Sequence, residues 1–393
     1  MYNIKPNTGN NHMSRLVFPL SAVFRGRRHL IPIGVNRNNP LGTRRKKERI
    51  MNKAILSKII TPVAAMAAMV MVLAGCGNSS ASSGASSSGD GTYSGTVSIA
   101  HASWMGFAPL DLAVKKGFFK KHGADVKIEN IESKSDSKSA LAAGRIQGIA
   151  TSLDTVVLSS AAGIDSQIVL ALDTSDGGDG LIAKKNISSF KDLKGKTVAL
   201  DTTGGASFFW FNYVAQKEGM SMKDFNVQSM SSGDAGSAFV AGKVDAAMTW
   251  QPWLDKAENT DFGKVLLSSR DYKGVIVDAL CLDTKFVKQY PKTVQAIVDG
   301  WDDALKYIKS NPDDAYKILD EVLGNDDVAA TKKMYETEIQ LWDKAENKKY
   351  FGEEGKGDAY KIADYAANLW YDTKMADTKI DAAKVLNPEF VQK

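Results

Sequence analysis

A regular alternation of strand-like and helix-like segments constrains the fold of this chain more than any other feature. The first series has expected strands at 96–101, 126–131, 146–150 and 168–173, with helices at 108–119, through 140–144 and at 155–162. A second series has strands at 197–200, 226–229, 246–249 and 265–268, with helices at 207–218 and 235–241. Because parallel strands need a long crossover connection, this order predicts an α/β fold with mostly parallel sheets flanked by helices.

The C-terminal third, from Pro291 on, is expected to be helical. Apolar residues recur there at three- and four-residue spacing, as in Val294, Ile297, Val298 and Trp301. A chain of 393 residues exceeds the usual size of one domain, so we expect two lobes, each with its own core.

Basic charge is concentrated at the start of the chain. Residues 1–76 contain thirteen lysines and arginines and one acidic residue, Glu48, whereas the remaining residues contain 37 basic and 44 acidic side chains. The formal net charge of +5 therefore does not describe the part expected to fold, which is acidic.

A short apolar segment, 59–74, follows Lys53 and Lys58 and closes on Leu73-Ala74-Gly75-Cys76. These are the features of a secretory signal peptide, and the apolar run is too short and too rich in alanine for a membrane span. The closing tetrapeptide resembles the lipobox of bacterial lipoproteins. That resemblance implies that residues 51–75 are removed and that Cys76 carries a lipid, which holds the protein at the extracytoplasmic face of the cell membrane. A cut elsewhere, with Cys76 incidental, is the alternative.

The segments on either side of this signal have different compositions. Residues 76–95 are nearly all Gly, Ser and Ala and are expected to form a flexible tether. Residues 1–50 do not suit a signal peptide, so we expect translation to begin at Met51, with codons 47–49 able to supply a purine-rich ribosome-binding site. A basic arm that binds nucleic acid is the weaker alternative, because an exported protein meets little nucleic acid.

No sequence motif of a catalytic or phosphate-binding site is present, whether G-x-S-x-G, H-E-x-x-H, C-x-x-C or the P-loop. After residue 76 the chain has two histidines, His101 and His122, and one cysteine, Cys281, in an apolar stretch. The cysteine is expected to be buried in the core, with a His/Cys dyad as the alternative. We expect no enzyme activity, no cofactor and no metal site.

Polar and aromatic residues gather in the loops that follow the expected strands, where open α/β sheets bind ligands. The candidate ligand-binding residues are Trp104, Asp154, Asp176, Asp179, Thr203, Ser207 and Trp250. The competing explanation for Asp154 is a helix N-cap, and for Asp176 and Asp179 it is a glycine-rich turn.

Five sequence blocks, taken in order, resemble a known group of binding proteins. They are G-F-F at 117–119 before G-A-D-V at 123–126, L-A-A-G-R-I-Q at 141–147, D-L-K-G-K-T-V at 192–198, A-G-K-V-D-A at 241–246 and T-W-Q-P-W-L at 249–254. Together they are similar to the nitrate/sulfonate/taurine/bicarbonate group of ABC-importer solute-binding proteins, over roughly residues 97–309.

This resemblance implies a two-lobed, type II periplasmic-binding-protein fold. Residues 96–181 and 278–393 would form lobe one and residues 182–277 lobe two, with hinges near 181–184 and 275–280. Solute binding would close the lobes. The protein, expected to be a monomer, would then dock on an ABC permease and its ATPase.

The resemblance leaves the solute open. Free helix N-termini at Ala108 and Ser207 suit an anion. Family members that hold oxyanions often have a histidine where this chain has Phe208, and its only arginines after residue 76, Arg145 and Arg270, lie outside the candidate loops. Acids beside tryptophans favour a cationic or nitrogen-rich small polar solute.

Two other classes of protein stay open at this point. One is a binding protein for a thiamine-pyrimidine precursor or the related synthase, an enzyme of the same fold that needs an iron-binding segment rich in His and Cys. The other is a sensory lipoprotein without an importer.

Overall fold

The computed structural model describes residues 89–353 and 355–393. The expected N-terminal extension, the signal peptide, Cys76 and most of the tether lie outside these residues. Tyr93, near the end of the expected tether, packs against Phe286 and Tyr290 with ring centroids 5.2 and 4.8 Å apart. Within the described residues, no helix combines the length and apolarity needed to cross a membrane.

The first of two sheets has six strands in the order β11-β4-β10-β3-β1-β2. Strand β1 pairs in parallel with β2 and β3, whereas β10 runs antiparallel to both β3 and β4. The strands are β1 (Thr96–His101), β2 (Asp125–Asn130), β3 (Gly148–Ser152), β4 (Ser166–Ser175), β10 (Val277–Asp283) and β11 (Ile339–Leu341).

The second sheet has five strands in the order β7-β6-β8-β5-β9. Strand β6 pairs in parallel with β7 and β8, and β5 runs antiparallel to β8 and β9. These strands are β5 (Asp179–Lys184), β6 (Thr197–Leu200), β7 (Asn226–Ser229), β8 (Ala246–Trp250) and β9 (Gly263–Ser268).

The predicted α/β fold class is confirmed, but each sheet is mixed rather than mostly parallel. The strands that carry the chain between the sheets cause the difference. In each sheet the strand that follows a link between the sheets runs antiparallel to its neighbours: β5 begins after the link at residues 176–178, and β10 begins after the link at residues 269–276.

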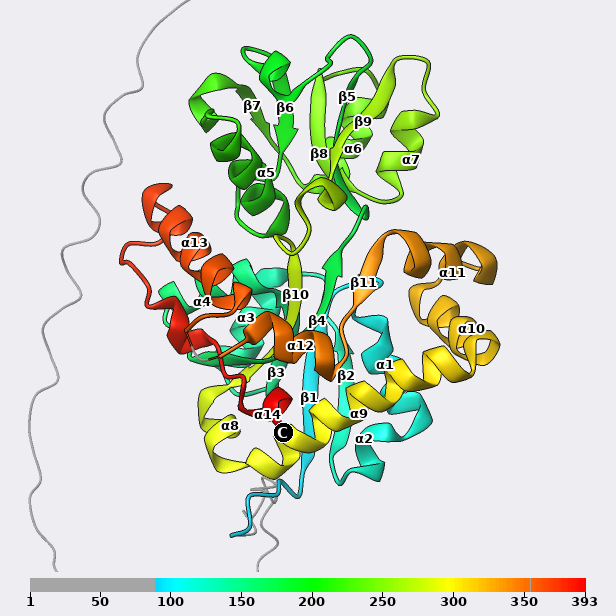
Figure 1. Ribbon diagram of the computed structural model, residues 1–393, viewed down its shortest axis with the longest axis vertical. Coiled ribbons are helices and arrows are strands. Elements are labelled where there is room, and N and C mark those ends of the chain that lie inside the picture. The colour runs from blue at the N-terminus through cyan, green and yellow to red at the C-terminus, as the bar shows by residue number, and fades with distance from the viewer. Residues whose placement is uncertain (1–88, 354) are drawn as a thin grey trace, which may run out of the picture. The chain divides into compact units, whose positions relative to one another are not determined.

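Helices cover both sheets, and the predicted helical C-terminal part is confirmed (Figure 1). The expected helix over 108–119 is interrupted because Gly117 adopts a left-handed φ of 75° and ends the first segment. The helices are α1 (Ala108–Lys116), α2 (Phe118–Lys121), α3 (Lys134–Ala142), α4 (Leu153–Ala161), α5 (Ala206–Lys217), α6 (Ser232–Val240), α7 (Trp253–Glu258), α8 (Thr284–Gln289), α9 (Pro291–Ser310), α10 (Pro312–Leu323), α11 (Val328–Thr337), α12 (Lys344–Phe351), α13 (Asp358–Asp372) and α14 (Glu389–Gln392).

Two links join the sheets, at residues 176–178 and 269–276. The first link lies three residues before the expected hinge at 181–184, and the second overlaps the start of the expected hinge at 275–280. The links are tied together, since the hydroxyls of Ser175 and Ser269 lie 2.8 Å apart and the Gly177 amide donates to Ser269 Oγ at 2.8 Å. The assignment of residue ranges to lobes, and of the links to a hinge, stays a prediction.

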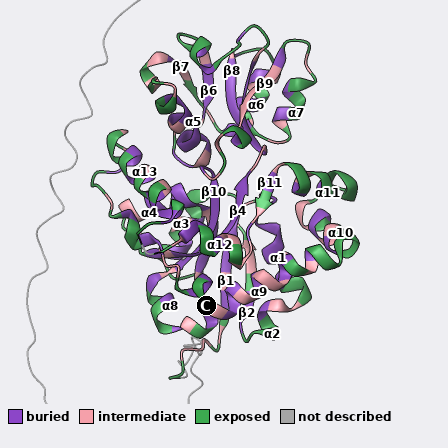
Figure 2. Cartoon of the chain, in the orientation of Figure 1, coloured by how far each residue is buried: buried purple, intermediate pink, exposed green. Residues whose placement is uncertain are grey.

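Buried aromatic residues hold the C-terminal helices against the sheets, whose central strands β4, β10, β5 and β8 are almost fully buried (Figure 2). On α13, Trp370 is fully buried and its indole N–H donates to the carbonyl oxygen of Asp154 at 2.9 Å. The rings of Phe208 and Phe209 on α5 lie 6.0 and 6.1 Å from the same tryptophan. Helix α13 therefore contacts both α4 and α5.

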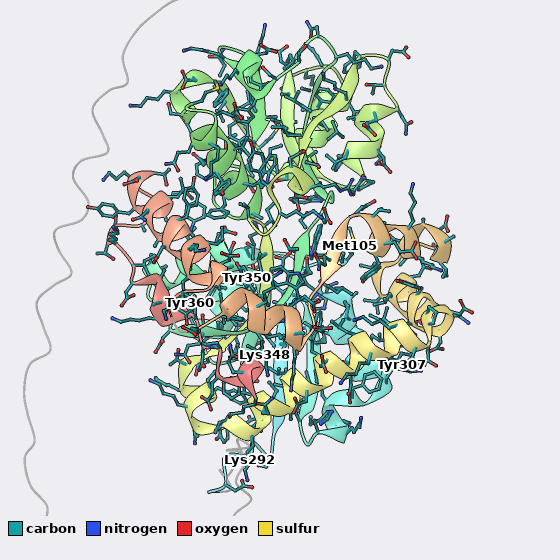
Figure 3. All side chains as sticks on the ribbon, in the orientation of Figure 1. Met105, Lys292, Tyr307, Lys348, Tyr350 and Tyr360 are labelled. Carbon is teal, nitrogen blue, oxygen red and sulfur yellow. The ribbon has the colours of Figure 1, made fainter. Side chains whose placement is uncertain are left out.

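The loop after β1 is held from the C-terminal region. The hydroxyl of Tyr335 on α11 donates to the carbonyl oxygen of Met105, which Figure 3 labels beside the crossing strands. Because both residues are buried, this contact sets the position of the loop that carries Trp104.

Candidate ligand-binding site

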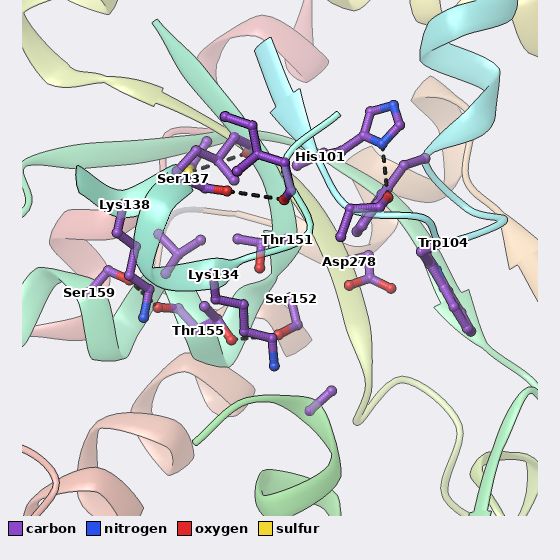
Figure 4. A pocket seen from close by; sticks show the side chains of 18 of the residues that line it. His101, Trp104, Lys134, Ser137, Lys138, Thr151, Ser152, Thr155, Ser159 and Asp278 are labelled. Atoms are coloured by element: carbon purple, nitrogen blue, oxygen red, sulfur yellow. Dashed lines mark hydrogen bonds between the residues drawn. The ribbon is translucent and has the colours of Figure 1, made fainter. Parts of the chain in front are cut away.

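A pocket of about 280 Å³ lies where the two sheets meet. Its lining comes mainly from elements of the six-stranded sheet, and Figure 4 shows its side chains. Asp179, Ala206 and Trp250 line it from the five-stranded sheet and its helix α5. A molecule in this pocket therefore contacts both sheets.

The carboxyl ends of parallel strands build the pocket, as expected for an open α/β sheet. Strand β3 leads directly into α4, and the junction residues Thr151, Ser152 and Thr155 line the cavity. The hydroxyls of Ser152 and Thr155 lie 2.9 Å apart. The N-terminal amides of α4 thus lie beside two hydroxyl groups at the cavity wall.

Two tryptophans line the pocket from different sheets. Trp104 follows β1, and its indole N–H donates to a carboxylate oxygen of Asp173 at 3.4 Å. Trp250 ends β8 directly opposite Asp179 of β5 and is 37% exposed. A large, partly exposed indole at a cavity wall is a suitable surface for a flat or cationic group.

Three carboxyl groups lie close to the links between the sheets. Asp173 lies two residues before the end of β4, and Asp179 begins β5. Asp278 lies on β10 directly opposite both Asp173 and Ser152. All three are more than nine-tenths buried, and Asp179 and Asp278 line the pocket. Like charges on directly opposed strand positions destabilise a sheet unless a proton or a cation neutralises them.

Burial raises the pKa of all three carboxyl groups. For Asp179 it raises the pKa to about 6. For Asp278, burial and then the charges of Asp173 and Asp179 raise the pKa well above its ordinary value. The pKa of Asp173 is also raised, by burial and by Asp179. One carboxyl oxygen of Asp173 is buried without a hydrogen-bond partner. The Asp278 carboxyl group lines the cavity and makes no hydrogen bond or ion pair with the described residues (Figure 4).

Helix α3 supplies a basic side to the pocket. Lys134 and Lys138 lie one turn apart on one helix face, and both line the cavity. A Cβ atom added at Gly205, the N-cap of α5, would lie 2.5 Å from Lys134 Nζ, so this ammonium group lies close to the N-terminus of α5. Burial lowers the pKa of Lys138, with a further contribution from the charge of Lys134.

His101 also lines the pocket, but both ring nitrogens are engaged. Nδ1 lies 2.9 Å from the carbonyl oxygen of Ala102, and Nε2 lies 2.8 Å from a carboxylate oxygen of Asp111. Burial opposes a charge on the ring, but the hydrogen bond and charge of Asp111 outweigh it and raise the pKa of His101. The ring thus has a structural role at the start of α1.

Of the expected ligand-binding residues, the structure brings Trp104, Asp179 and Trp250 together in the pocket. Asp154, Thr203 and Ser207 do not line it. Ser207 is buried and accepts a hydrogen bond from Ser232 at 3.0 Å, and Thr203 is exposed and donates to Asp201. Asp154 is buried with one carboxyl oxygen unpaired, and burial raises its pKa to about 6.

Asp176 lies in the first link and is held by two cations. Arg270 Nε donates to one carboxylate oxygen at 3.3 Å, and Lys273 Nζ lies 2.7 Å from the other. Arg270 also donates to the carbonyl oxygens of Asp176 and Thr337. The ligand role of Asp176 stays a prediction, and these contacts favour a role in joining the links.

Four charged residues that line the pocket were not among the predicted ligand-binding residues. They are Glu132, Lys134, Lys138 and Asp278. The available signal for Asp278 is an acid inside the apolar strand sequence V-D-A-L-C-L-D. The lysines lie in a polar helix with no local feature that separates them from solvated residues. Across residues 89–353 and 355–393, no group of three His, Cys, Asp or Glu side chains is arranged to hold a metal ion.

Solved structures of periplasmic binding proteins have the same arrangement of elements. The periplasmic aliphatic sulphonate binding protein SsuA from Escherichia coli matches with a TM-score of 0.63 at 16% identity, over 76% of this chain and 99% of that protein. The alkanesulfonate-binding protein SsuA from Xanthomonas axonopodis pv. citri, bound to MOPS, matches with a TM-score of 0.60 at 17% identity, over 75% and 98%. The chain therefore has the periplasmic-binding-protein fold.

The sequence comparisons identify the family. Residues 104–315, more than half of the chain, match the family described as NMT1/THI5 like, and the chain belongs to that family. A Bacillus subtilis (strain 168) protein, provisionally named an aliphatic sulfonates-binding protein, is 26% identical over 84% of this chain and 95% of its own length. The taurine-binding periplasmic protein of Escherichia coli (strain K12) is 24% identical over 50% of this chain and 61% of its own length.

Proposed function

We propose that this protein is the extracytoplasmic solute-binding component of an ABC importer. It captures a small charged solute between its two sheets and delivers the solute to a permease that an ATPase drives. The observation that carries the proposal is the pocket itself, because Asp179 and Trp250 of one sheet line it together with Trp104 and Asp278 of the other. Relatives that bind sulfonates and taurine support it.

The pocket favours a solute with a cationic nitrogen. The Asp278 carboxyl group is buried without a partner in the described residues, and Asp179 lies close enough to raise its pKa. An ammonium or guanidinium group would neutralise both, and the tryptophan faces would stabilise the same charge. Lys134, beside the N-terminus of α5, is placed to hold an anionic group, so a zwitterion uses both sides of the pocket.

A role in binding without catalysis is part of the proposal. Burial raises the pKa of the Cys281 thiol to about 11, and its S–H donates to the carbonyl oxygen of Ile149. A thiol in this state is a poor nucleophile at neutral pH. His101, the histidine in the pocket, is held by Asp111 and Ala102. These contacts occupy the two side chains best suited to acid–base or nucleophilic chemistry.

A thermal-shift screen of the protein tests the binding function. The panel contains taurine, alkanesulfonates, nitrate, bicarbonate, guanidinium compounds and a thiamine-type pyrimidine. A solute that binds only the folded state increases the free energy of unfolding, by about 2.7 kcal/mol when its concentration is one hundred times its Kd, and the melting temperature rises accordingly. We expect amine-bearing members to stabilise the wild type and to lose that effect in Asp179→Asn. Stabilisation by ethanesulfonate alone, unchanged in Asp179→Asn, would contradict a cationic group on the solute.

Uptake separates an importer component from a sensory lipoprotein. A strain that lacks this protein should lose accumulation of the radiolabelled solute identified in the screen, and the wild-type gene should restore it. Normal accumulation in the deletion strain would favour the sensory alternative.

Size-exclusion chromatography with light scattering checks the expected monomer.

Attachment through a lipid on Cys76 remains a prediction of the sequence. In cells fed labelled palmitate, the full chain should incorporate label and sediment with membranes, because the lipid inserts into the bilayer. Cys76→Ala should remove the label, whereas Cys281→Ala, which changes a buried thiol, should retain it. Label that persists in Cys76→Ala would show that the protein is modified elsewhere.

A further inference from the structure

The pocket extends from its mouth into the interior of the six-stranded sheet's helical layer. At the mouth, Ser152 of β3 lies opposite Asp278 of β10. Three residues further along the same strands, Ile149 lies opposite Cys281, and both line the cavity. At about 3.3 Å per residue, the cavity therefore follows the sheet for roughly 10 Å.

Helices α3 and α4 cover this extension along their length. On α4, the cavity lining runs from Thr155 at the mouth to Ser159 one turn later, and on α3 it runs from Lys134 to Leu141. In Figure 4, Lys138 and Ser159 lie at the opposite end of the cavity from Trp104. The inner part is called the inner chamber below, and its apolar lining residues are Leu141, Ile149, Val156, Ile164 and Cys281.

Two hydroxyl groups and the thiol of the inner chamber donate to backbone carbonyl oxygens, and Ser166 lines the cavity beside the thiol. Ser159 Oγ donates to the carbonyl oxygen of Thr155 at 2.6 Å, and Ser137 Oγ donates to that of Ser133 at 3.1 Å. The Cys281 thiol donates to the carbonyl oxygen of Ile149 at 3.4 Å. With these donors in use, the chamber presents mainly hydrocarbon to its contents, and the Lys138 side chain enters along one edge.

The size of the pocket exceeds what a small ion needs. The mouth and the inner chamber together have a volume of about 280 Å³, and an apolar cavity of roughly 150 Å³ holds benzene in another protein. The mouth, with Asp278, Asp179 and Lys134, accommodates charged groups. Behind the mouth, Lys138 is the one charged side chain among the residues that line the inner chamber.

We propose that the inner chamber binds a hydrocarbon body of the solute, about the size of a benzene ring, while the solute's charged groups stay at the mouth. The ligand class is thus an aryl or branched-alkyl compound with a charged head group rather than a two-carbon compound. The part of this inference that concerns the charged head group rests on the proposed function. The part that concerns the inner chamber does not, because a neutral probe can test it.

Fluorobenzene is that neutral probe, observed by 19F NMR with the full chain. We expect saturable line broadening that Val156→Phe abolishes, because the larger side chain fills the chamber. Val157→Ala is the matched control, since Val157 is as buried as Val156 on the same helix but does not line the pocket. It should leave fluorobenzene binding unchanged, whereas Val156→Ala, which enlarges the chamber, should alter it.

Cys281 provides a second measurement that does not depend on how well the Val156→Phe variant folds. Methyl methanethiosulfonate at pH 9 should modify Cys281 slowly in the folded wild type, as measured by mass spectrometry of its peptide. Fluorobenzene should protect Cys281, and Val156→Ala should accelerate its modification. Absence of fluorobenzene binding, together with Cys281 modification that neither fluorobenzene nor Val156→Ala changes, would overturn the chamber.

Matched head groups separate this inference from the proposed function. Titration calorimetry compares ethylammonium with 2-phenylethylammonium, and ethanesulfonate with 2-phenylethanesulfonate. In whichever pair binds, we expect the phenyl compound to bind at least about tenfold more tightly, because the ring is removed from water. Equal affinities within a pair that binds would refute the chamber and keep the binding function. Binding of fluorobenzene without binding of any charged compound would refute the proposed function and keep the chamber.

Discussion

Replacement of Asp278 by Asn is expected to weaken binding of an amine-bearing solute about 10- to 100-fold and to stabilise the unliganded protein. A hydrogen bond to a charged group contributes about 1.5–3 kcal/mol, and each 1.4 kcal/mol is a tenfold change in Kd. Without solute, the same carboxyl group faces Asp173 across the sheet in a buried site, so its neutral replacement removes a repulsion. Calorimetric titration and urea unfolding at pH 8 measure the two effects.

The opposite signs of these effects distinguish a ligand-binding residue from a structural one. Asp283→Asn is the matched control, because Asp283 lies on the same strand and caps α8 through the Phe286 amide at 2.9 Å. Asn caps helices about as well as Asp, so both affinity and stability should stay within experimental error. A loss of stability in Asp278→Asn with unchanged affinity would contradict its assignment to the site.

Stability of the unliganded protein is expected to fall as the pH rises from about 4 to 8. The raised pKa values of Asp154, Asp179 and Asp278 mean that the folded state keeps protons that the unfolded chain releases near pH 4. Their stabilising contribution is therefore complete below the unfolded pKa and is lost as the pH rises through about 6 and above. A shift of about two pKa units corresponds to roughly 3 kcal/mol for one buried carboxyl group.

Urea unfolding at pH 5, 6, 7 and 8 measures this dependence, with Asp179→Asn as the variant and Asp283→Asn as the control. The Asp179→Asn curve should be flatter than that of the wild type over pH 5–7, and the control should follow the wild type. Carboxyl groups with lowered pKa, such as Asp245 and Asp343, titrate below this window. Parallel curves for wild type and Asp179→Asn would show that Asp179 ionises normally in the folded protein.

Three of the predicted residues line the candidate pocket because the signals that selected them are local. Trp104 and Trp250 are large aromatics directly after strands, and Asp179 lies in a glycine-rich turn, so the rule that ligands bind at strand ends was sufficient. The same rule also selected Thr203 and Ser207, which the structure places outside the pocket lining. A loop position predicts nearness to the site, but the direction of a side chain depends on the neighbouring elements.

Other residues reach the pocket lining only through contacts between segments far apart in the chain, namely Asp278, Lys134 and Lys138. Asp278 reaches the site because β10 inserts antiparallel between β3 and β4. No local pattern specifies that insertion, since it depends on the return of the chain from the second sheet. The lysines belong to the site because α3 covers the sheet beside the cavity.

The sequence by itself determined the α/β class, the positions of most strands and helices and the family resemblance, because periodicity and turn residues act over a few neighbouring residues. Only the tertiary structure decided that the sheets are mixed, that three carboxyl groups meet at the links and that the pocket continues into an inner chamber. Strand order and helix packing bring together residues such as Asp173 and Asp278 or Ile149 and Cys281. Their burial, and with it their pKa values and the hydrocarbon character of the cavity, exists only once those elements have assembled.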